Sequence, residues 1–242
     1  MLRLIRGEIY RLFCKKSLFI YFGALTLGYL ALAFIRSGGF TPESVIDDAL
    51  SLFILLPALV GGFLFAAIYT DDLNSKNLIS LVGSRASRAT IIFAKFVLMA
   101  LFSVVAFGLA PLLHLGIYAL FGQVATAGMA KMLFATAFKY LLASLAYAAL
   151  SGIVVYGLQR TTFAIVTYLL LAFGVVSGLV SVALNMFAPS LIQHLITGIT
   201  DRILLTLVSG GSLVFPLIEY TVYVVIAVAV SLVVFSRREM EF

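Results

Sequence analysis

The sequence predicts an all-α integral membrane protein with six transmembrane helices. Of the 242 residues, 63% are hydrophobic and only 11% are charged, and the mean hydropathy is +1.18. A soluble domain has about 45–50% apolar and about 25% charged residues. The apolar residues also fall into six long runs, and roughly 20 apolar residues cross a bilayer as a helix. Composition and pattern together predict a single transmembrane domain over residues 1–242.

The six expected spans follow one another along the chain. They are Leu18–Ile35, Ala49–Tyr69, Thr90–Phe121, Leu141–Tyr156, Phe163–Leu184 and Leu213–Phe235. The third run is longer than a bilayer needs, and Pro111 inside it is expected to kink or tilt the helix. An interfacial turn from Met129 is expected to extend the fourth span backwards.

Residues 1–17 predict an amphipathic helix at the inner membrane interface. Their apolar residues follow helical spacing, and the charged ones fall mainly on other faces; the apolar set is Leu2, Ile5, Ile9, Leu12 and Phe13, and the charged set is Arg3, Arg6, Glu8, Arg11 and Lys15. Two interpretations stay open. The helix either only anchors the topology, or it is an elbow that also touches a cytoplasmic partner.

The distribution of basic residues predicts the orientation. Six spans place both termini on one side, and if that side is the cytoplasm, twelve of the sixteen Lys and Arg residues lie inside. The other four are Arg36, Lys131, Lys139 and Arg202. Because cytoplasmic loops carry an excess of basic residues, both termini are expected in the cytoplasm. Lys131 and Lys139 are then expected to reach the outer lipid headgroups.

The sequence contains none of the common catalytic or nucleotide-binding motifs. GxxxxGK[ST], HExxH, GxSxG and CxxC are all missing, and neither His114 nor His194 has metal-ligand spacing around it. We therefore expect no catalytic residue, no metal site and no cofactor in this chain. The net charge of +6 is explained by the positive-inside pattern, so no nucleic-acid partner is expected.

Two ionisable residues within the expected spans are candidates for a translocation path. His114 follows Pro111 in the third span, and Glu219 follows Pro216 near the outer end of the sixth. An ionisable residue inside a span suggests function by default. The alternative is that His114 only bonds to a neighbouring helix or a carbonyl freed by the proline, and that Glu219 only reaches interfacial water.

Small residues recur at close-packing intervals in two spans. Gly174 and Gly178 form a GxxxG pattern in the fifth span, and Ser144, Ala148 and Gly152 repeat every fourth residue in the fourth. Such faces let helices approach closely. They predict either packing inside the bundle or a dimer contact.

The charged segment "TDDLNSKNLISLVGSRASRATIIFAKF" (70–96) separates the second and third spans. Acidic residues favour a helix start, so Asp71 and Asp72 predict a short helix, and Gly83 can end it. One face of that helix would hold the apolar residues Leu78, Leu81 and Val82.

A basic entry into the third span follows, formed by Arg85, Arg88 and Lys95. A plain connection needs only a few residues, so the segment is predicted to dock a soluble partner. The alternative is a solvated hairpin that carries only positive-inside charge.

The chain resembles the membrane subunit of type-2 ABC exporters, the permease class that includes small bacitracin- and lantibiotic-type export and immunity transporters. The matching residues are Asp71 or Asp72, "NLISLVGSRASR" and Lys95. The chain departs from the pattern with Asp where Glu is common and with Gly83 where proline is common. The likeness extends over the whole chain. It includes a basic N-terminal elbow, six spans, short loops and a long last outer loop.

The resemblance implies that 71–83 is a coupling helix seated on a separate soluble ATPase subunit, which would hold ATP and Mg. The implied ATPase-docking residues are Asp71, Asp72, Lys76, Leu78, Leu81, Val82, Arg85 and Arg88. The transporter would contain a second permease copy or paralogue, and this chain would not itself be an enzyme. The implied location is the bacterial cytoplasmic membrane, in contact with lipid.

Residues 189–211 predict one or two short outer helices before the last span. Their apolar residues Ile192, Leu195, Ile196 and Ile199 share a helical face, but the segment is too polar and broken for a seventh span. The resemblance implies re-entrant helices that cap the exit. The alternative is an interfacial amphipathic helix without a gating role.

Spans rich in Phe and Tyr and poor in charge suit an amphipathic or hydrophobic cargo, such as a peptide, an antibiotic or a lipid. The same side chains would also face lipid. Two other functions remain as alternatives: a stand-alone secondary carrier, and a non-transport membrane protein such as a scaffold or an enzyme. Few ionisable residues at depth argue against the carrier, and the missing motifs argue against an enzyme.

Overall fold

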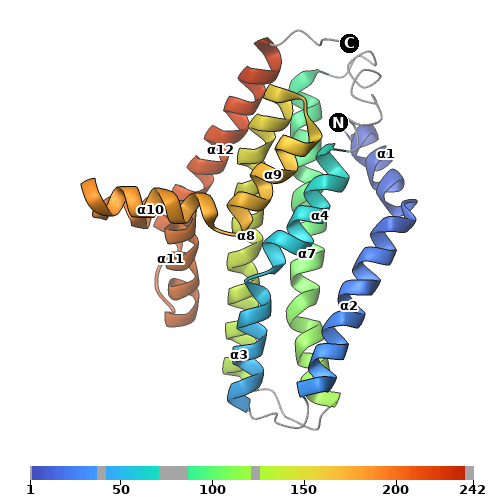
Figure 1. The fold of residues 1–242 in the computed structure, drawn as a ribbon, viewed down its shortest axis with the longest axis vertical. Coiled ribbons are helices and arrows are strands. Elements are labelled where there is room, and N and C mark those ends of the chain that lie inside the picture. The colour runs from blue at the N-terminus through green and yellow to red at the C-terminus, as the bar shows by residue number, and fades with distance from the viewer. Residues whose placement is uncertain (1, 37–41, 71–86, 121–125, 238–242) are drawn as a thin grey trace.

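The protein is a bundle of helices, and none of its described residues forms a strand (Figure 1). The computed structural model describes residues 2–36, 42–70, 87–120 and 126–237. The helices in chain order are α1 (Leu2–Phe13), α2 (Lys16–Arg36), α3 (Pro42–Phe53), the π-helix η2 (Pro57–Gly61), α4 (Gly62–Phe65), the π-helix η3 (Ala66–Thr70), α7 (Arg88–Leu120), α8 (Ala127–Leu158), α9 (Thr161–Ala172), α10 (Val175–Phe187), the 3₁₀-helix η4 (Pro189–His194), α11 (Ile196–Ser209) and α12 (Val214–Arg237).

Several helices are long and apolar enough to cross a membrane, which makes this a multi-pass membrane protein. Among the described residues four segments meet the requirement, Asp47–Tyr69, Arg88–Ile117, Ala127–Leu158 and Val214–Arg237. The bent pair α9 and α10 adds a fifth if it counts as one span. Helix α2 covers the first expected span. Its apolar part, Lys16–Gly28, is shorter than a helix that crosses a membrane. The number of six spans therefore stays a prediction.

Helix α8 lies at the centre of the bundle. Its most apolar window is 67% buried, against 28% for the windows of α7 and α12, and it packs against α3, α7, α9, α11 and α12. Thr126 caps its start, because the Thr126 hydroxyl accepts a hydrogen bond from the Met129 N–H at 3.3 Å. The expected backward extension of this span from Met129 is thus present, and the helix is 32 residues long.

The small-residue stripe of α8 packs inside the bundle. Ser144 and Ala148 are fully buried, and Gly152 faces Ser231 of α12, whose hydroxyl would lie 3.5 Å from an added Cβ. Of the two alternatives left open for this stripe, the structure supports packing within the chain.

The fifth expected span is not one continuous helix. α9 and α10 are bent by 58° at Phe173–Gly174, and Gly174 has φ +74°, in the left-handed region that glycine adopts most readily. The expected GxxxG face is therefore broken at its first glycine, and Gly178 has open space around it. Figure 1 shows α10 projecting sideways from the bundle.

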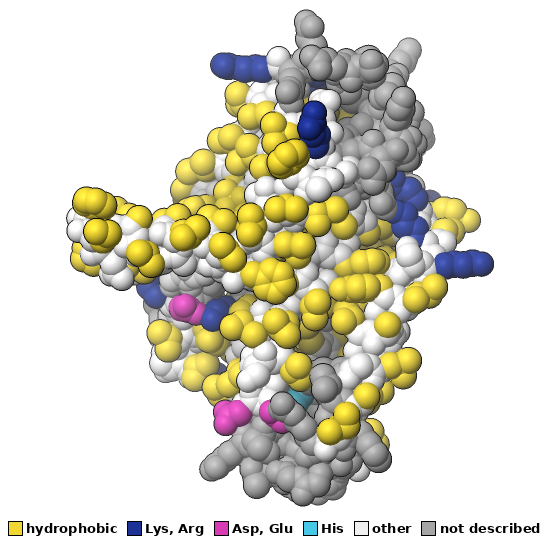
Figure 2. Space-filling model, viewed as in Figure 1, with side chains coloured by type: hydrophobic (Ala, Val, Ile, Leu, Met, Phe, Trp, Pro, Cys, Tyr) yellow, Lys and Arg dark blue, Asp and Glu magenta, His cyan; other side chains and the backbone are white. Residues whose placement is uncertain are grey.

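Hydrophobic side chains cover much of the surface in Figure 2, including the projecting α10. On α10, Leu179 is 69% exposed and Met186 is 76% exposed. Apolar surface of this kind fits a protein whose surroundings are lipid rather than water.

The prolines in the second and third expected spans have different effects on their helices. α7 continues through Pro111 as a single helix, so the proline does not end it. The second expected span is irregular instead, because α3 stops at Phe53 and two π-helical segments follow Pro57. A proline has no backbone N–H to donate, which favours a break at this point.

Helix α1 forms where the N-terminal amphipathic helix is expected, and it packs against α7. Leu12 is fully buried, whereas Tyr10 and Phe13 are exposed. The structure differs from the expected face pattern at Glu8, which is buried although the spacing put it among the polar residues.

Candidate functional site

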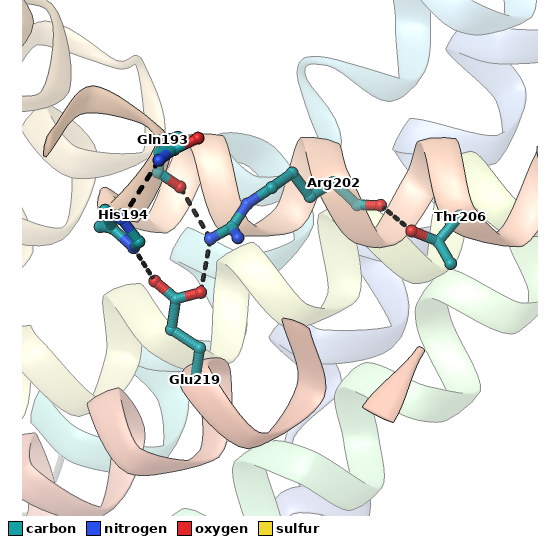
Figure 3. Close-up of polar contacts among 5 residues, drawn as sticks. All are labelled: Gln193, His194, Arg202, Thr206 and Glu219. Atoms are coloured by element: carbon teal, nitrogen blue, oxygen red, sulfur yellow. Dashed lines mark hydrogen bonds and ion pairs between the residues drawn. The ribbon is translucent and has the colours of Figure 1, made fainter. Parts of the chain in front are cut away.

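The clearest polar cluster surrounds Glu219, near the start of α12 (Figure 3). One carboxylate oxygen of Glu219 lies 2.6 Å from Nδ1 of His194, and the other accepts a hydrogen bond from Nη2 of Arg202. Arg202 also donates to the backbone carbonyl of Gln193 at 2.9 Å. The cluster thus joins η4, α11 and α12 through a single carboxylate.

The hydrophobic face of α11 positions Arg202. Ile196, Ile199 and Ile203 are buried, and α11 packs against α8 and α12. Arg202 precedes Ile203 and points along the other side of the helix, toward Glu219 (Figure 3). The expected 189–211 segment is therefore two short helices, with α11 docked on the bundle by its apolar face.

Two lysines of α8 also contact α11. Lys131 donates from Nζ to the carbonyl of Val208 at 3.0 Å, near the C-terminal end of α11, and Lys139 forms an ion pair with Asp201. A cation at a helix C-terminus is favourable because the free carbonyls there carry partial negative charge. Both lysines therefore contact α11, and their expected reach to the outer lipid headgroups stays a prediction.

Glu219 is held by charge-assisted hydrogen bonds rather than by interfacial water alone. Its side chain is 20% exposed, and Arg202 and His194 occupy both oxygens. Hydrogen bonds between charged groups are among the stronger ones in proteins. The arrangement joins three helices through one carboxylate.

His114, the other residue expected in a translocation path, lies elsewhere. It is 7% exposed on α7, and its ring meets the Phe53 ring of α3 edge to face, with centroids 6.4 Å apart. It therefore does not belong to the Glu219 cluster. Its packing against α3 is compatible with the alternative of a neighbouring-helix contact.

Of the expected ATPase-docking residues, the structure describes Arg88 alone. Arg88 donates from Nη1 to the carbonyls of Phe235 and Ser236, the latter at 3.0 Å, and its guanidinium carbon lies 5.3 Å from the centre of the Phe235 ring. It therefore joins the start of α7 to the end of α12. Asp71, Asp72, Lys76, Leu78, Leu81, Val82 and Arg85 lie outside the described residues.

A second polar contact of α7 lies two turns further along. Lys95 is 2% exposed and its Nζ lies 3.1 Å from Oε2 of Glu8 on α1, an oxygen that also pairs with Arg11 at 2.6 Å. The sequence places Lys95 in the basic entry to the third expected span. Glu8 is the single acidic residue of segment 1–17, but Arg11 three residues later already offers it a partner, so the sequence carried no signal for the contact with Lys95.

The part of the chain that the structure describes has no group of three or more His, Cys, Asp or Glu side chains arranged to hold a metal ion.

Comparison of the chain with protein-family models and with curated proteins finds no match.

Proposed function

We propose that this chain is the membrane permease subunit of an ATP-driven exporter of the type-2 ABC class. The observation that carries the proposal is the charged segment 70–96 of a multi-pass helical protein, whose "NLISLVGSRASR" and flanking residues resemble a coupling helix of that class. ATP hydrolysis would take place on a separate soluble subunit. This agrees with a sequence that contains no phosphate-binding loop.

The proposed cargo is an amphipathic or hydrophobic molecule: a peptide, an antibiotic or a lipid. Support comes from the scarcity of charge in the apolar helices and from the aromatic residues in them. Two permease chains, identical or paralogous, would form the path, in the bacterial cytoplasmic membrane with both termini inside. His114 and Glu219 are proposed to line the path or to hold its walls.

The proposed docking face is tested by changing Leu78 and Leu81 to Asp together. An unpaired carboxylate at a tight interface costs several kcal/mol, so the double variant is expected to lose its ATPase. Pull-down of the ATPase by tagged permease measures this, and the amount of permease in the membrane is determined in parallel.

Arg85→Ala is the comparison variant within the same docking segment. If Arg85 mainly contacts lipid headgroups, it contributes roughly 1 kcal/mol, so this variant is expected to lose less ATPase than the double Asp variant. Arg88 is a poor control, because it also holds the end of α12. If the double Asp variant binds the ATPase as well as the parent does, segment 70–96 is only a hairpin and the proposed function loses its basis.

A further inference from the structure

Regular helix is interrupted in the middle of the second membrane-spanning segment. The π-helix η2 begins at Pro57, one turn of α-helix (α4) follows, and the π-helix η3 completes the segment to Thr70. π-Helical turns are rare and frequently lie at functional sites. Two of them between Pro57 and Thr70 call for a physical explanation.

Two tyrosines from different helices donate hydrogen bonds to the backbone of η2. Tyr21 of α2 donates to the carbonyl of Leu59 at 2.8 Å, and Tyr168 of α9 donates to the carbonyl of Pro57 at 3.1 Å. Tyr168 is fully buried, and its oxygen lies 2.7 Å from Oγ of Ser144 on α8. Because the single proton of Tyr168 goes to Pro57, the Ser144 hydroxyl must donate to Tyr168.

The rings of the same tyrosines hold the next turn, α4. Tyr21 stacks on Phe63 with centroids 4.0 Å apart and planes 5° apart, and Tyr168 stacks on Phe65 at 4.8 Å. At Gly61 an added Cβ would overlap the Ser144 and Tyr168 hydroxyl oxygens. The backbone of η2 therefore lies directly against Ser144 and Tyr168, and only glycine at position 61 leaves room for this approach.

We propose that η2 is a hinge in this span, and that Tyr21 and Tyr168 are the positioning residues that hold it in its π-helical form. The carbonyls of Pro57 and Leu59 also accept from the backbone N–H of Gly62, so each tyrosine hydroxyl adds a second donor to a carbonyl of the π-helical turn. A π turn holds about one residue more than an α turn. Conversion of η2 to α-helix would therefore turn the following residues by about 100° about the helix axis.

The residues that would turn are those of α4 and η3, which lead to Thr70 and thus to the charged segment 70–96. The two hydroxyl groups accordingly control the direction in which the chain leaves the bundle. The hinge belongs to this chain alone and holds whether or not an ATPase docks. Its test is therefore independent of the proposed function.

The test measures hydrogen–deuterium exchange of the full chain in lipid nanodiscs, resolved by mass spectrometry of its peptides. Tyr21→Phe and Tyr168→Phe each keep the ring and remove the hydroxyl. Loss of one such hydrogen bond is expected to raise exchange in peptides covering residues 57–70 about fivefold. Ser144→Ala keeps the bond from Tyr168 to Pro57, so it is expected to change exchange there less than twofold.

The matched control is Tyr220→Phe. The Tyr220 hydroxyl donates to the carbonyl of Leu142 at 2.8 Å, which is the same kind of bond but on the regular helix α8. Exchange in 57–70 is expected to stay unchanged in this variant. The proposal is overturned if both Tyr→Phe variants at positions 21 and 168 leave exchange in 57–70 unchanged, or if the control raises it equally.

A variant that loosens the whole bundle would raise exchange in α8 as well. If Tyr168→Phe does so, Tyr21→Phe decides, because Tyr21 is only half-buried on the rim of the bundle. Faster exchange confined to 57–70 in that variant supports the hinge. An unchanged rate there rules it out.

Discussion

At the scale of single residues, several charged side chains in the described part of the chain join one helix to another. Glu219 binds Arg202 and His194, Lys139 binds Asp201, and Lys95 reaches Glu8. Charge within an apolar bundle is costly unless it is paired. These few charge pairs therefore show which helices are held together by polar contacts.

The Glu219 cluster is expected to contribute more than the neighbouring ion pair. Glu219→Gln removes the carboxylate that binds Arg202 and His194 and is expected to cost about 1–3 kcal/mol. Asp201→Asn removes the partner of Lys139, but the Asp201 side chain is 55% exposed, so the expected cost is below about 1 kcal/mol. Thermal unfolding of both variants in the same detergent compares them. An equal fall in the melting temperature would contradict the larger contribution assigned to Glu219.

At the scale of elements, the local sequence decides where helices break. Gly174 bends α9 away from α10, whereas Pro111 leaves α7 continuous. A proline inside a span is tolerated when its surroundings satisfy the freed carbonyl. A glycine with positive φ instead ends the helix outright, because the left-handed conformation cannot continue it.

Gly174 and Gly178 therefore predict opposite results on substitution. Gly174→Ala puts a side chain at φ +74° and is expected to cost about 1–2 kcal/mol. Gly178→Ala meets no atom within 4 Å inside a helix, so it is expected to be neutral or stabilising by up to about 1 kcal/mol. Thermal unfolding of the two variants measures the difference. A larger loss of stability in the Gly178 variant would instead support the GxxxG packing face that the sequence suggested.

At the scale of the whole molecule, composition and apolar periodicity were enough to predict an all-helical, multi-pass membrane protein. Long helices form at 88–120, 127–158 and 214–237, near the expected ranges. Hydropathy shows which residues are apolar but not the course of the helix axis. The bend at Gly174 and the π-helical turns after Pro57 could therefore not be predicted from it. Pairings such as Lys131 with Val208 join residues far apart in sequence, and only the packed fold brings them together.

Orientation is the whole-molecule property that the basic residues predict. With both termini in the cytoplasm, a cysteine placed at Ser75 lies inside and one placed at Gly39 lies outside. In intact cells a membrane-impermeant maleimide is expected to label the Gly39→Cys variant and to spare the Ser75→Cys variant. Cys14 is replaced by Ser in both to remove background. Labelling at position 75 from outside would reverse the orientation and remove the docking proposal with it.

Because α8 lies at the centre, the bundle cannot close until the ribosome has made the last helix. Gly152 of α8 meets Ser231 of α12, which is synthesised long after α8 has entered the bilayer. During that interval the Gly152 end of the small-residue face of α8 has no α12 to cover it, whereas Ser144 can already pack against Tyr168 of α9. A nascent chain that stalls before Val214 would keep this end of the face open to lipid or to the insertion machinery.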